Sequence, residues 1–257
     1  MSKPQDSAEL IATFAPKGKL DMEIEKFHKK AVLVGANELI GRKCLLQLLQ
    51  HEAYSKIHLL MEEPLNFEHP KLEVFQINFE HLSRYTELLQ VDDVYYCWDG
   101  SMKIKHDPGK YKPEQTYAYE LAKLAYEAGI KQYVYLSSIA ADPDNVLYYR
   151  HEKQQLEHSI AQIPFWALHI FRPAFLLEDD QASKGIRLVK NLANRLNNMT
   201  SGGLDKYQPV SALGLAKLMI KQAQRFRPGI HIYSSEFIKQ NISTNEKGLS
   251  KKDGKSS

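Results

Sequence analysis

From Lys30 onward, short apolar runs alternate with longer stretches in which apolar residues recur every three or four positions. The short runs are typical of strands buried on both faces, and the longer stretches are typical of helices with one apolar face. The expected strands are Ala31–Val34, Lys56–Met61, Leu72–Ile77, Asp93–Cys97, Gln132–Leu136, Trp166–Phe171 and Ile230–Tyr233. The expected helices are Ile40–Gln50, Ser83–Leu89, Pro113–Ala128, Tyr148–Ala161, Lys184–Asn197 and Ala212–Phe226. This alternation predicts an α/β protein, a single domain with a Rossmann-type, doubly wound parallel sheet.

Several helix ends have a local physical cause. Pro113 suits a first helical turn, Gly129 suits the position just after a helix, and the Ser211 hydroxyl can cap the last expected helix. The elements divide the chain into an N-terminal extension over 1–29, a Rossmann-like domain over 30–238 and a tail over 239–257. The tail is rich in Lys, Ser, Asn and Gly, so we expect it to be disordered.

Composition and charge exclude several classes of protein. The 257 residues carry a formal charge of only +3, with basic and acidic residues interspersed, so no nucleic-acid surface is expected. No apolar run approaches the roughly 18 residues that span a bilayer, and the first residues lack a signal-peptide core. We expect a cytoplasmic protein without a membrane role, in which Cys44 and Cys97 are reduced thiols.

The segment from Ala31 to Gly41 combines a buried strand with a glycine turn. Gly35 would make the tight turn, and Gly41 would let the following helix pack closely on the sheet, as in dinucleotide-binding folds. Between them, Glu38 occupies the position where a backbone normally approaches a pyrophosphate. Its carboxylate either opposes a diphosphate or points away into solvent.

A candidate catalytic group follows the strand Gln132–Leu136. That strand ends in Ser137 and Ser138, and the next helix carries Tyr149 and Lys153, which a spacing of four places on one face. A nearby ammonium lowers the pKa of a tyrosine, and a serine hydroxyl can hydrogen-bond a carbonyl oxygen as charge develops on it. This combination suits hydride transfer between a nicotinamide and a carbonyl or alcohol.

Two other patterns have simpler explanations. Tyr119 and Lys123 repeat the spacing of four without a serine-ended strand before them, so we interpret them as a solvated helix face. His151, His158 and His169 lack a metal-ligand pattern with Cys or acids, and no metal site is expected.

Taken in order, these pieces resemble an atypical short-chain dehydrogenase/reductase, and within that class the Tat-interactive-protein-like oxidoreductases, which border the NmrA-like redox sensors. The resemblance runs from about Lys30 to about Ile238. Its most specific pieces are Leu136–Asp142, Tyr149-x-x-x-Lys153-x-x-x-Glu157 and the strand exit Phe171–Leu177, which is similar to the family's Arg-Pro-Gly segment.

The resemblance implies a set of residues around a dinucleotide. The contacts come from the first turn, from the exit of the fourth strand and from the nicotinamide end of the site: Gly35, Ala36, Asn37, Leu39, Ile40, Gly41, Cys97, Gly100, Lys153 and Pro173. Glu38 lies among them in place of the family's middle glycine.

A second departure concerns cofactor choice. Glu62 and Glu63 stand where the family has a basic pair after the second strand. An acid there can hydrogen-bond a ribose 2′-hydroxyl but repels a 2′-phosphate, so NAD is favoured over NADP.

Three readings of function stay open. The first is an NAD-dependent oxidoreductase that acts on a small carbonyl or alcohol, and the second is a catalytically weak or inactive scaffold or redox sensor with the same fold. The third, which overlaps the second, is a protein that docks a partner through Tyr111, Tyr117, Tyr119 and Tyr126. The partners that these readings allow are a dinucleotide, a small-molecule substrate, a second copy of the chain or another protein.

Overall fold

A computed structural model describes residues 28–63, 65–98, 111–137, 146–173, 175–177 and 209–250. Its centre is a sheet of seven parallel strands in the order β3-β2-β1-β4-β5-β6-β9. The strands are β1 (Lys29–Val34), β2 (Tyr54–Met61), β3 (Leu72–Gln76), β4 (Asp93–Tyr96), β5 (Gln132–Leu136), β6 (Ala167–Phe171) and β9 (Gly229–Tyr233). The predicted single-domain, doubly wound parallel sheet is confirmed, and each predicted strand is present with small shifts of its ends.

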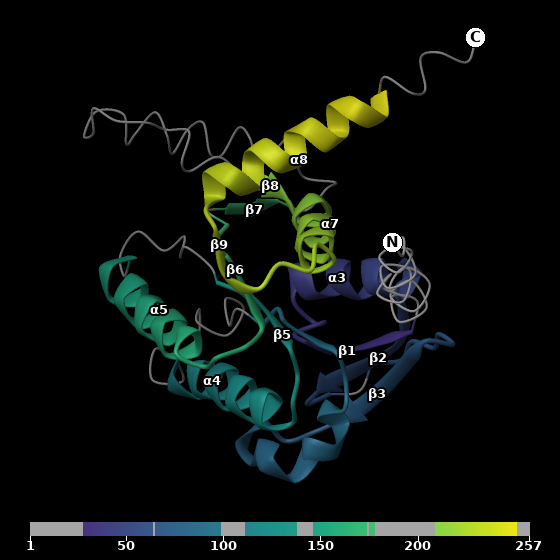
Figure 1. The fold of residues 1–257 in the computed structure, drawn as a ribbon, viewed down its shortest axis with the longest axis vertical. Helices are drawn as coiled ribbons and strands as arrows, with labels where there is room; N and C mark the ends of the chain where they lie inside the picture. The colour runs from purple at the N-terminus through teal and green to yellow at the C-terminus, as the bar shows by residue number, and fades with distance from the viewer. Residues whose placement is uncertain are drawn as a thin grey trace, which may run out of the picture.

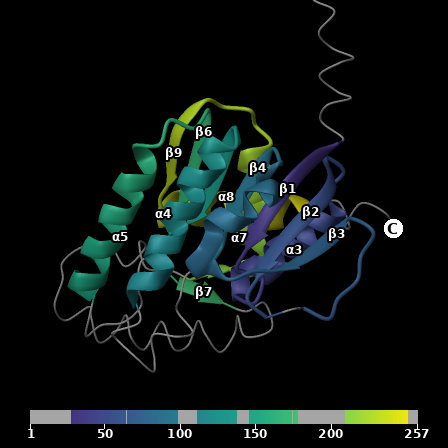
Figure 2. The ribbon, with the colours of Figure 1, turned by 90° about the horizontal axis from the view of Figure 1, so that it is seen from below.

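Helices cover both faces of this sheet (Figures 1 and 2). One face packs against α3 (Leu39–Gln50), α7 (Ala212–Ala223) and α8 (Ser235–Ser250). The other packs against η1 (Phe79–Leu89), α4 (Tyr111–Glu127) and α5 (Val146–Ala161). The helix predicted over 184–197 lies outside the described residues.

The predicted helix ends agree with the local geometry. Gly129 has a φ of +84°, and its N–H donates to the Tyr126 carbonyl at 2.9 Å, which closes α4. The Gly214 N–H donates to the Ser211 hydroxyl at 3.0 Å, so Ser211 caps α7 as predicted. Pro113 is the third residue of α4, within its first turn.

Three local predictions were wrong. The segment predicted as the helix Ser83–Leu89 belongs to the longer 3₁₀ element η1, which has non-helical φ and ψ at His81 and Tyr85. The helix predicted to reach Phe226 ends at Ala223. The short parallel strands β7 (Phe175–Leu177) and β8 (Pro209–Ser211) were not predicted, because three residues are too few to show a strand period.

The prediction of disorder from Lys239 onward was also wrong for the residues that the structure describes. The chain continues as helix α8 through Ser250 (yellow in Figure 1). Ile238 is fully buried and Ile242 is 7% exposed, both in the core beneath α3 and α7. A Cβ added to Gly214 on α7 would lie 2.6 Å from Ile242, so the two helices approach closely. These buried isoleucines anchor the start of a helix whose average composition is polar.

A chain of buried polar side chains crosses the sheet on the α7 side. It consists of Lys29, Tyr54, Asp93, Gln132, His169 and Tyr233, and we call it the buried network. It begins at the amino-terminal ends of β1, β2, β4 and β5 and continues through β6 to β9.

Asp93 is the charged centre of the buried network. Its carboxylate pairs with the Lys29 ammonium at 2.5 Å, and it accepts hydrogen bonds from the Tyr54 hydroxyl and, at 3.0 Å, from the Gln132 amide. Burial raises the pKa of Asp93, and the charge of Lys29 opposes that rise. Because a buried carboxylate without partners costs free energy, these contacts offset the cost of burying Asp93. They also fix the relative positions of four strands.

His169 joins Asp93's half of the network to β9. Its two ring nitrogens lie 3.2 Å from the Gln132 amide oxygen and 3.0 Å from the Tyr233 hydroxyl. Gln132 donates through its nitrogen to Asp93, so its oxygen accepts from Nε2–H of His169, and Nδ1 then accepts from Tyr233. Burial, followed by the nearby His231 and Lys29, lowers the pKa of His169 to about 4, which keeps the ring neutral.

Candidate functional site

The turn after β1 is built around two glycines at which a Cβ would collide with backbone. Gly35 has a φ of +88°, and a Cβ there would lie 2.5 Å from the backbone nitrogen of Trp98. A Cβ on Gly41 would lie 1.9 Å from the Gly35 carbonyl oxygen. The expected roles of both glycines in the backbone, a tight turn and a close approach of α3, are therefore confirmed.

Helix α3 begins directly at this turn. The Glu38 N–H donates to the Gly35 carbonyl at 2.9 Å, and the Glu38 carbonyl accepts the first helical hydrogen bond from Arg42 at 2.9 Å. Glu38 is thus the N-cap residue, and its side chain makes no capping hydrogen bond to the first turn of α3. A helix start with its amides directed outward and no acid in its first turn is typical of anion-binding turns.

The Glu38 side chain does not point into solvent, which was one of the two alternatives left by the sequence. Glu38 is only 7% exposed, with a φ of −83° that any residue adopts. The position therefore has no need of glycine for backbone reasons, and a carboxylate lies within the protein beside the turn. The other residues of the turn are placed as the strand-turn-helix pattern requires: Ala36 and Ile40 are buried, Leu39 is partly buried and Asn37 is exposed.

Four strand exits line up at the carboxyl edge of the sheet. Strand β1 runs into Gly35, β4 into Cys97, β5 into Ser137 and β6 into Pro173. Neighbouring exits are tied together: the Cys97 N–H donates to the Val34 carbonyl at 2.9 Å, and the Ser137 N–H donates to the Phe171 carbonyl at 2.8 Å. The fold thus brings these predicted site residues to one edge, where ligands of open α/β sheets bind.

Glu62 and Glu63 follow the end of β2 at the same edge, next to β1. Both side chains are exposed. The backbone of Glu62 is held by the Gln76 amide, which donates to its carbonyl at 3.0 Å. An exposed carboxylate at this position lies at the strand end where Rossmann folds recognise a ribose.

The predicted catalytic residues are only partly described. Tyr149 and Lys153 lie in helix α5, whose side chains are described from residue 154 onward. Ser137 is 2% exposed at the end of β5. Ser138 and Gly100 fall outside the described residues.

Glu157 forms a contact to which the sequence analysis assigned no role. Its carboxylate, on α5, accepts from the Arg172 guanidinium, with Nε of Arg172 2.9 Å from Oε2 and a second, shorter contact from Nη2. Glu157 is 5% exposed, and Arg172 immediately follows β6. This charge-assisted ion pair therefore fixes α5 against the strand exit that leads to Pro173. The signal in the sequence was that Glu157 continues the spacing of four from Tyr149 and Lys153.

The tyrosines of α4 form ordinary surface and core. Tyr119 is 39% exposed, and Lys123 forms a helical ion pair with Glu127 at 3.9 Å, which confirms the interpretation as a solvated helix face. Tyr117 stacks on Trp98 with ring centroids 6.1 Å apart, so it belongs to the core rather than to a docking surface.

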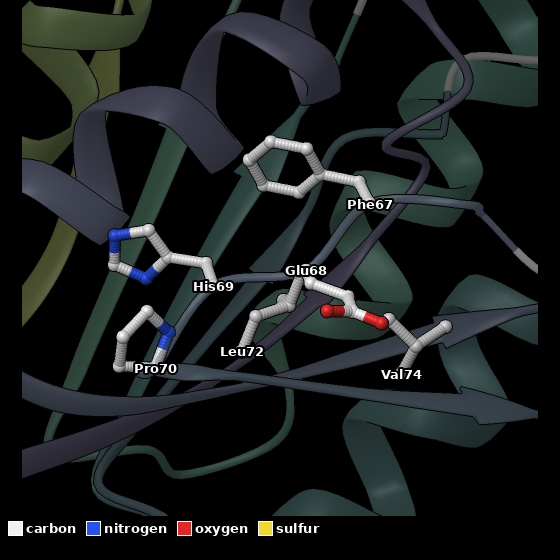
Figure 3. A pocket seen from close by; sticks show the side chains of 6 residues that line it. All are labelled: Phe67, Glu68, His69, Pro70, Leu72 and Val74. Carbon is white, nitrogen blue, oxygen red and sulfur yellow. The ribbon is translucent and has the colours of Figure 1, made fainter.

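A separate hollow of about 620 Å³ lies on the outer strand β3 (Figure 3). Its lining comes from β3 and the loop before it, namely Phe67, Glu68, His69, Pro70, Leu72 and Val74. None of the predicted site residues lines it. Among the described residues, no group of three or more His, Cys, Asp or Glu is arranged to hold a metal ion, and no helix is long and apolar enough to cross a membrane.

Comparisons with known proteins agree with this architecture. The rat protein HTATIP2 is 29% identical over 170 residues, covering 65% of this chain and 70% of that protein. A protein named FMP52, mitochondrial, from Debaryomyces hansenii is 25% identical over 201 residues, covering 75% of this chain and 87% of the relative. The chain is thus similar to HTATIP2 and to an FMP52 protein, in line with the resemblance seen in its motifs. No protein-family model matches it.

Solved structures share the fold of this chain. The Bordetella bronchiseptica enzyme WbmH, crystallised with NAD⁺, has a TM-score of 0.58 at 15% identity, covering 86% of this chain and 82% of the enzyme. The Lactococcus lactis oxidoreductase ylbE has a TM-score of 0.57 at 14% identity, covering 85% of this chain and 97% of the oxidoreductase. At these identities the likeness establishes the fold.

Proposed function

We propose that the protein binds a nicotinamide dinucleotide, NAD in preference to NADP, across the carboxyl ends of β1, β4, β5 and β6, and that it is an oxidoreductase acting on a small carbonyl or alcohol. The observation that carries this proposal is the turn from Gly35 to Gly41, where a Cβ on either glycine would collide with backbone. Such a turn presents bare main chain to a ligand.

The residues of the turn fit the pyrophosphate of a dinucleotide in two respects. The amino-terminal end of α3 faces the edge where neighbouring strand exits meet, and its first turn contains no acid. WbmH and a related Bordetella enzyme, WbmG, share this fold and were crystallised with NAD. Glu38 is the one residue that opposes the fit.

Bound NAD would supply the hydride acceptor or donor. Within the chain, we assign Tyr149 as the general acid or base, Lys153 as the cation that lowers its pKa, and Ser137 or Ser138 as the hydrogen-bond partner of the substrate oxygen. Positions 149, 153 and 157 share one helical face by their spacing. The ion pair between Glu157 and Arg172 holds that face of α5 against the exit of β6.

A specific observation favours a second candidate, a scaffold or redox sensor of the NmrA-like kind. Glu38 is buried beside the turn, so its charge is less screened there than at a surface. A carboxylate in that position weakens the binding of a diphosphate. A protein with this penalty would bind the dinucleotide weakly and turn over slowly or not at all.

The chain contains a matched pair for testing the oxidoreductase. Tyr149→Phe removes the proposed acid, whereas Tyr119→Phe alters the same Tyr-x-x-x-Lys spacing on the exposed face of α4. Against a panel of aldehydes and ketones with NADH, we expect Tyr149→Phe to lose at least about a hundredfold in kcat/KM and Tyr119→Phe to match the native protein. Native turnover in the Tyr149→Phe variant would refute the mechanism.

Cofactor preference has its own test. Because Glu62 and Glu63 are exposed at the end of β2, we expect NADH to bind more tightly than NADPH. The double substitution Glu62→Arg with Glu63→Arg should reverse this order by roughly 1 to 3 kcal/mol, as measured by calorimetry. Equal affinities of the native protein for both cofactors would contradict the assignment.

The proposed compartment is the cytoplasm, because Cys44 and Cys97 are free thiols, as is usual in a reducing compartment. The FMP52 relatives are named mitochondrial, which is the competing location. Fractionation of cells that express the tagged chain distinguishes the two.

A further inference from the structure

Strand β9 (Gly229–Tyr233) is an edge of the seven-stranded sheet. On its inner side, the Gly229 N–H donates to the Trp166 carbonyl at 2.8 Å, and the Tyr233 carbonyl accepts from the Arg172 N–H at 3.0 Å. Backbone groups alternate in direction along a strand, so those of Ile230 and Ile232 face away from β6. Within the described ranges, no strand pairs with them.

The side chains of β9 leave an apolar surface at this edge. Ile230 is 53% exposed and Ile232 is 51% exposed. In the register of the sheet they lie beside Leu168 and Ile170, which are each 1% exposed in the core under α4 and α5. The core face of the sheet therefore continues onto the edge strand. Trp166, at the start of β6, adds a side chain that is 43% exposed.

The opposite edge of the sheet is protected in ways that β9 is not. Strand β3 carries Glu73, which pairs with Lys56 on the neighbouring strand, and the loop 65–70 lies along it. Natural edge strands are commonly blunted by charges, prolines or bulges, because a bare edge recruits another strand. Residues 229–233 contain no lysine, no proline and no acidic residue.

We propose that β9 pairs antiparallel with β9 of a second copy of this chain, around a two-fold axis beside His231. In this register Ile230 of one copy lies opposite Ile232 of the other, and both present outward backbone groups. Such a pair exchanges two hydrogen bonds, and the register makes two of these pairs. His231 then lies opposite His231 of the second copy in a position without hydrogen bonds.

The occupant is a second copy because the edge is complementary to itself. The pattern of outward backbone and isoleucine is the same when read in either direction from His231. The charges that flank the strand also match: Arg227 precedes it and Glu236 follows it, and both are exposed. The two-fold axis brings Arg227 of each copy near Glu236 of the other, which is the isologous arrangement of a symmetric dimer.

The first test is the mass of the full chain in solution, measured by size exclusion with light scattering. We expect the native protein to be a dimer. Ile232→Lys should be a monomer with the native circular dichroism spectrum, because this side chain lies outside the core. Ile230→Pro should also be a monomer, because it removes an N–H that faces away from β6. Phe67→Lys, which alters an equally apolar residue at the other edge, should remain a dimer.

Cross-linking tests the register itself. In His231→Cys, two thiols would face each other across a pair without hydrogen bonds, where Cα atoms lie about 4.5 Å apart, within the range that a disulfide spans. The native thiols Cys44 and Cys97 are buried and provide a low background. We expect mild oxidation of this variant to yield a covalent dimer. A monomeric native protein, a dimer that survives Ile232→Lys, or a dimer in which His231→Cys does not cross-link would overturn the proposal.

Discussion

The two ends of the parallel strands are held together by opposite means. At the carboxyl end, the turn of Gly35 and Gly41 depends on the absence of side chains, because backbone meets backbone there at distances that exclude a Cβ. Toward the amino end, the buried network depends on polar side chains that satisfy one another around Asp93. The first arrangement leaves main chain available for a ligand, and the second uses its polar groups internally. Polar groups at the amino end of the strands therefore stabilise the fold, whereas main-chain groups at the carboxyl end stay available for function.

Among substitutions that distinguish the two ends of the strands, Asp93→Ala should cause the largest loss of stability. It leaves the buried Lys29 without its counter-charge, and breaking such a pair typically costs about 3 to 5 kcal/mol. Urea unfolding followed by circular dichroism measures this loss, and NADH affinity should not change. Lys56→Ala breaks a partly exposed pair with Glu73 and should cost less than about 1 kcal/mol. A stability of Asp93→Ala close to that of the native protein would show that the network does not hold the strands.

The buried network also makes stability depend on pH. The pKa of His169 is about 4 in the folded protein and 6.5 when exposed, so between these values the unfolded chain binds a proton that the folded chain does not. The contribution of His169 is therefore complete above pH 6.5 and is lost as the pH falls toward 4, by about 3 kcal/mol.

The raised pKa of Asp93 changes the pH dependence of stability in the opposite direction. Comparison of variants separates the contribution of His169 from that of Asp93. The free energy of unfolding of His169→Gln should vary less with pH than that of the native protein over this range. Exposed His81→Gln is the control and should follow the native curve. Parallel pH profiles for native and His169→Gln proteins would contradict a neutral, buried His169.

At the carboxyl end, two glycine substitutions separate backbone crowding from backbone strain. Gly41→Ala forces a Cβ to within 1.9 Å of the Gly35 carbonyl oxygen, so the turn must move; we expect a loss of about 2 kcal/mol in stability and at least tenfold in NADH affinity. Gly129→Ala strains a residue with φ of +84° that has open space around it, at a cost of about 1 to 2 kcal/mol and with unchanged NADH affinity. Native affinity in Gly41→Ala would exclude the turn as the dinucleotide site.

The sequence predicted the carboxyl end better than the amino end for a physical reason. Glycine spacing and apolar runs are local signals, so the strands, the turn and the Ser211 cap could be read directly. The buried network joins residues as distant as Lys29 and Tyr233, and a lone Asp93 or His169 carries no local sign of its partners. Helix α8 was missed because the disorder argument averaged composition over the tail, whereas the start of the helix buries Ile238 and Ile242 in the core.

The central claim, that the glycine turn is a dinucleotide site weakened by Glu38, is tested most directly by calorimetric titration of native protein and Glu38→Gly with NADH. Glu38 has a φ of −83°, so the substitution removes a buried carboxylate without relieving any backbone strain. Glu38→Gln separates charge from size. We expect Glu38→Gly to bind NADH at least tenfold more tightly, about 1.4 kcal/mol, with an unchanged circular dichroism spectrum. Failure of both proteins to bind NADH at millimolar concentration would contradict it.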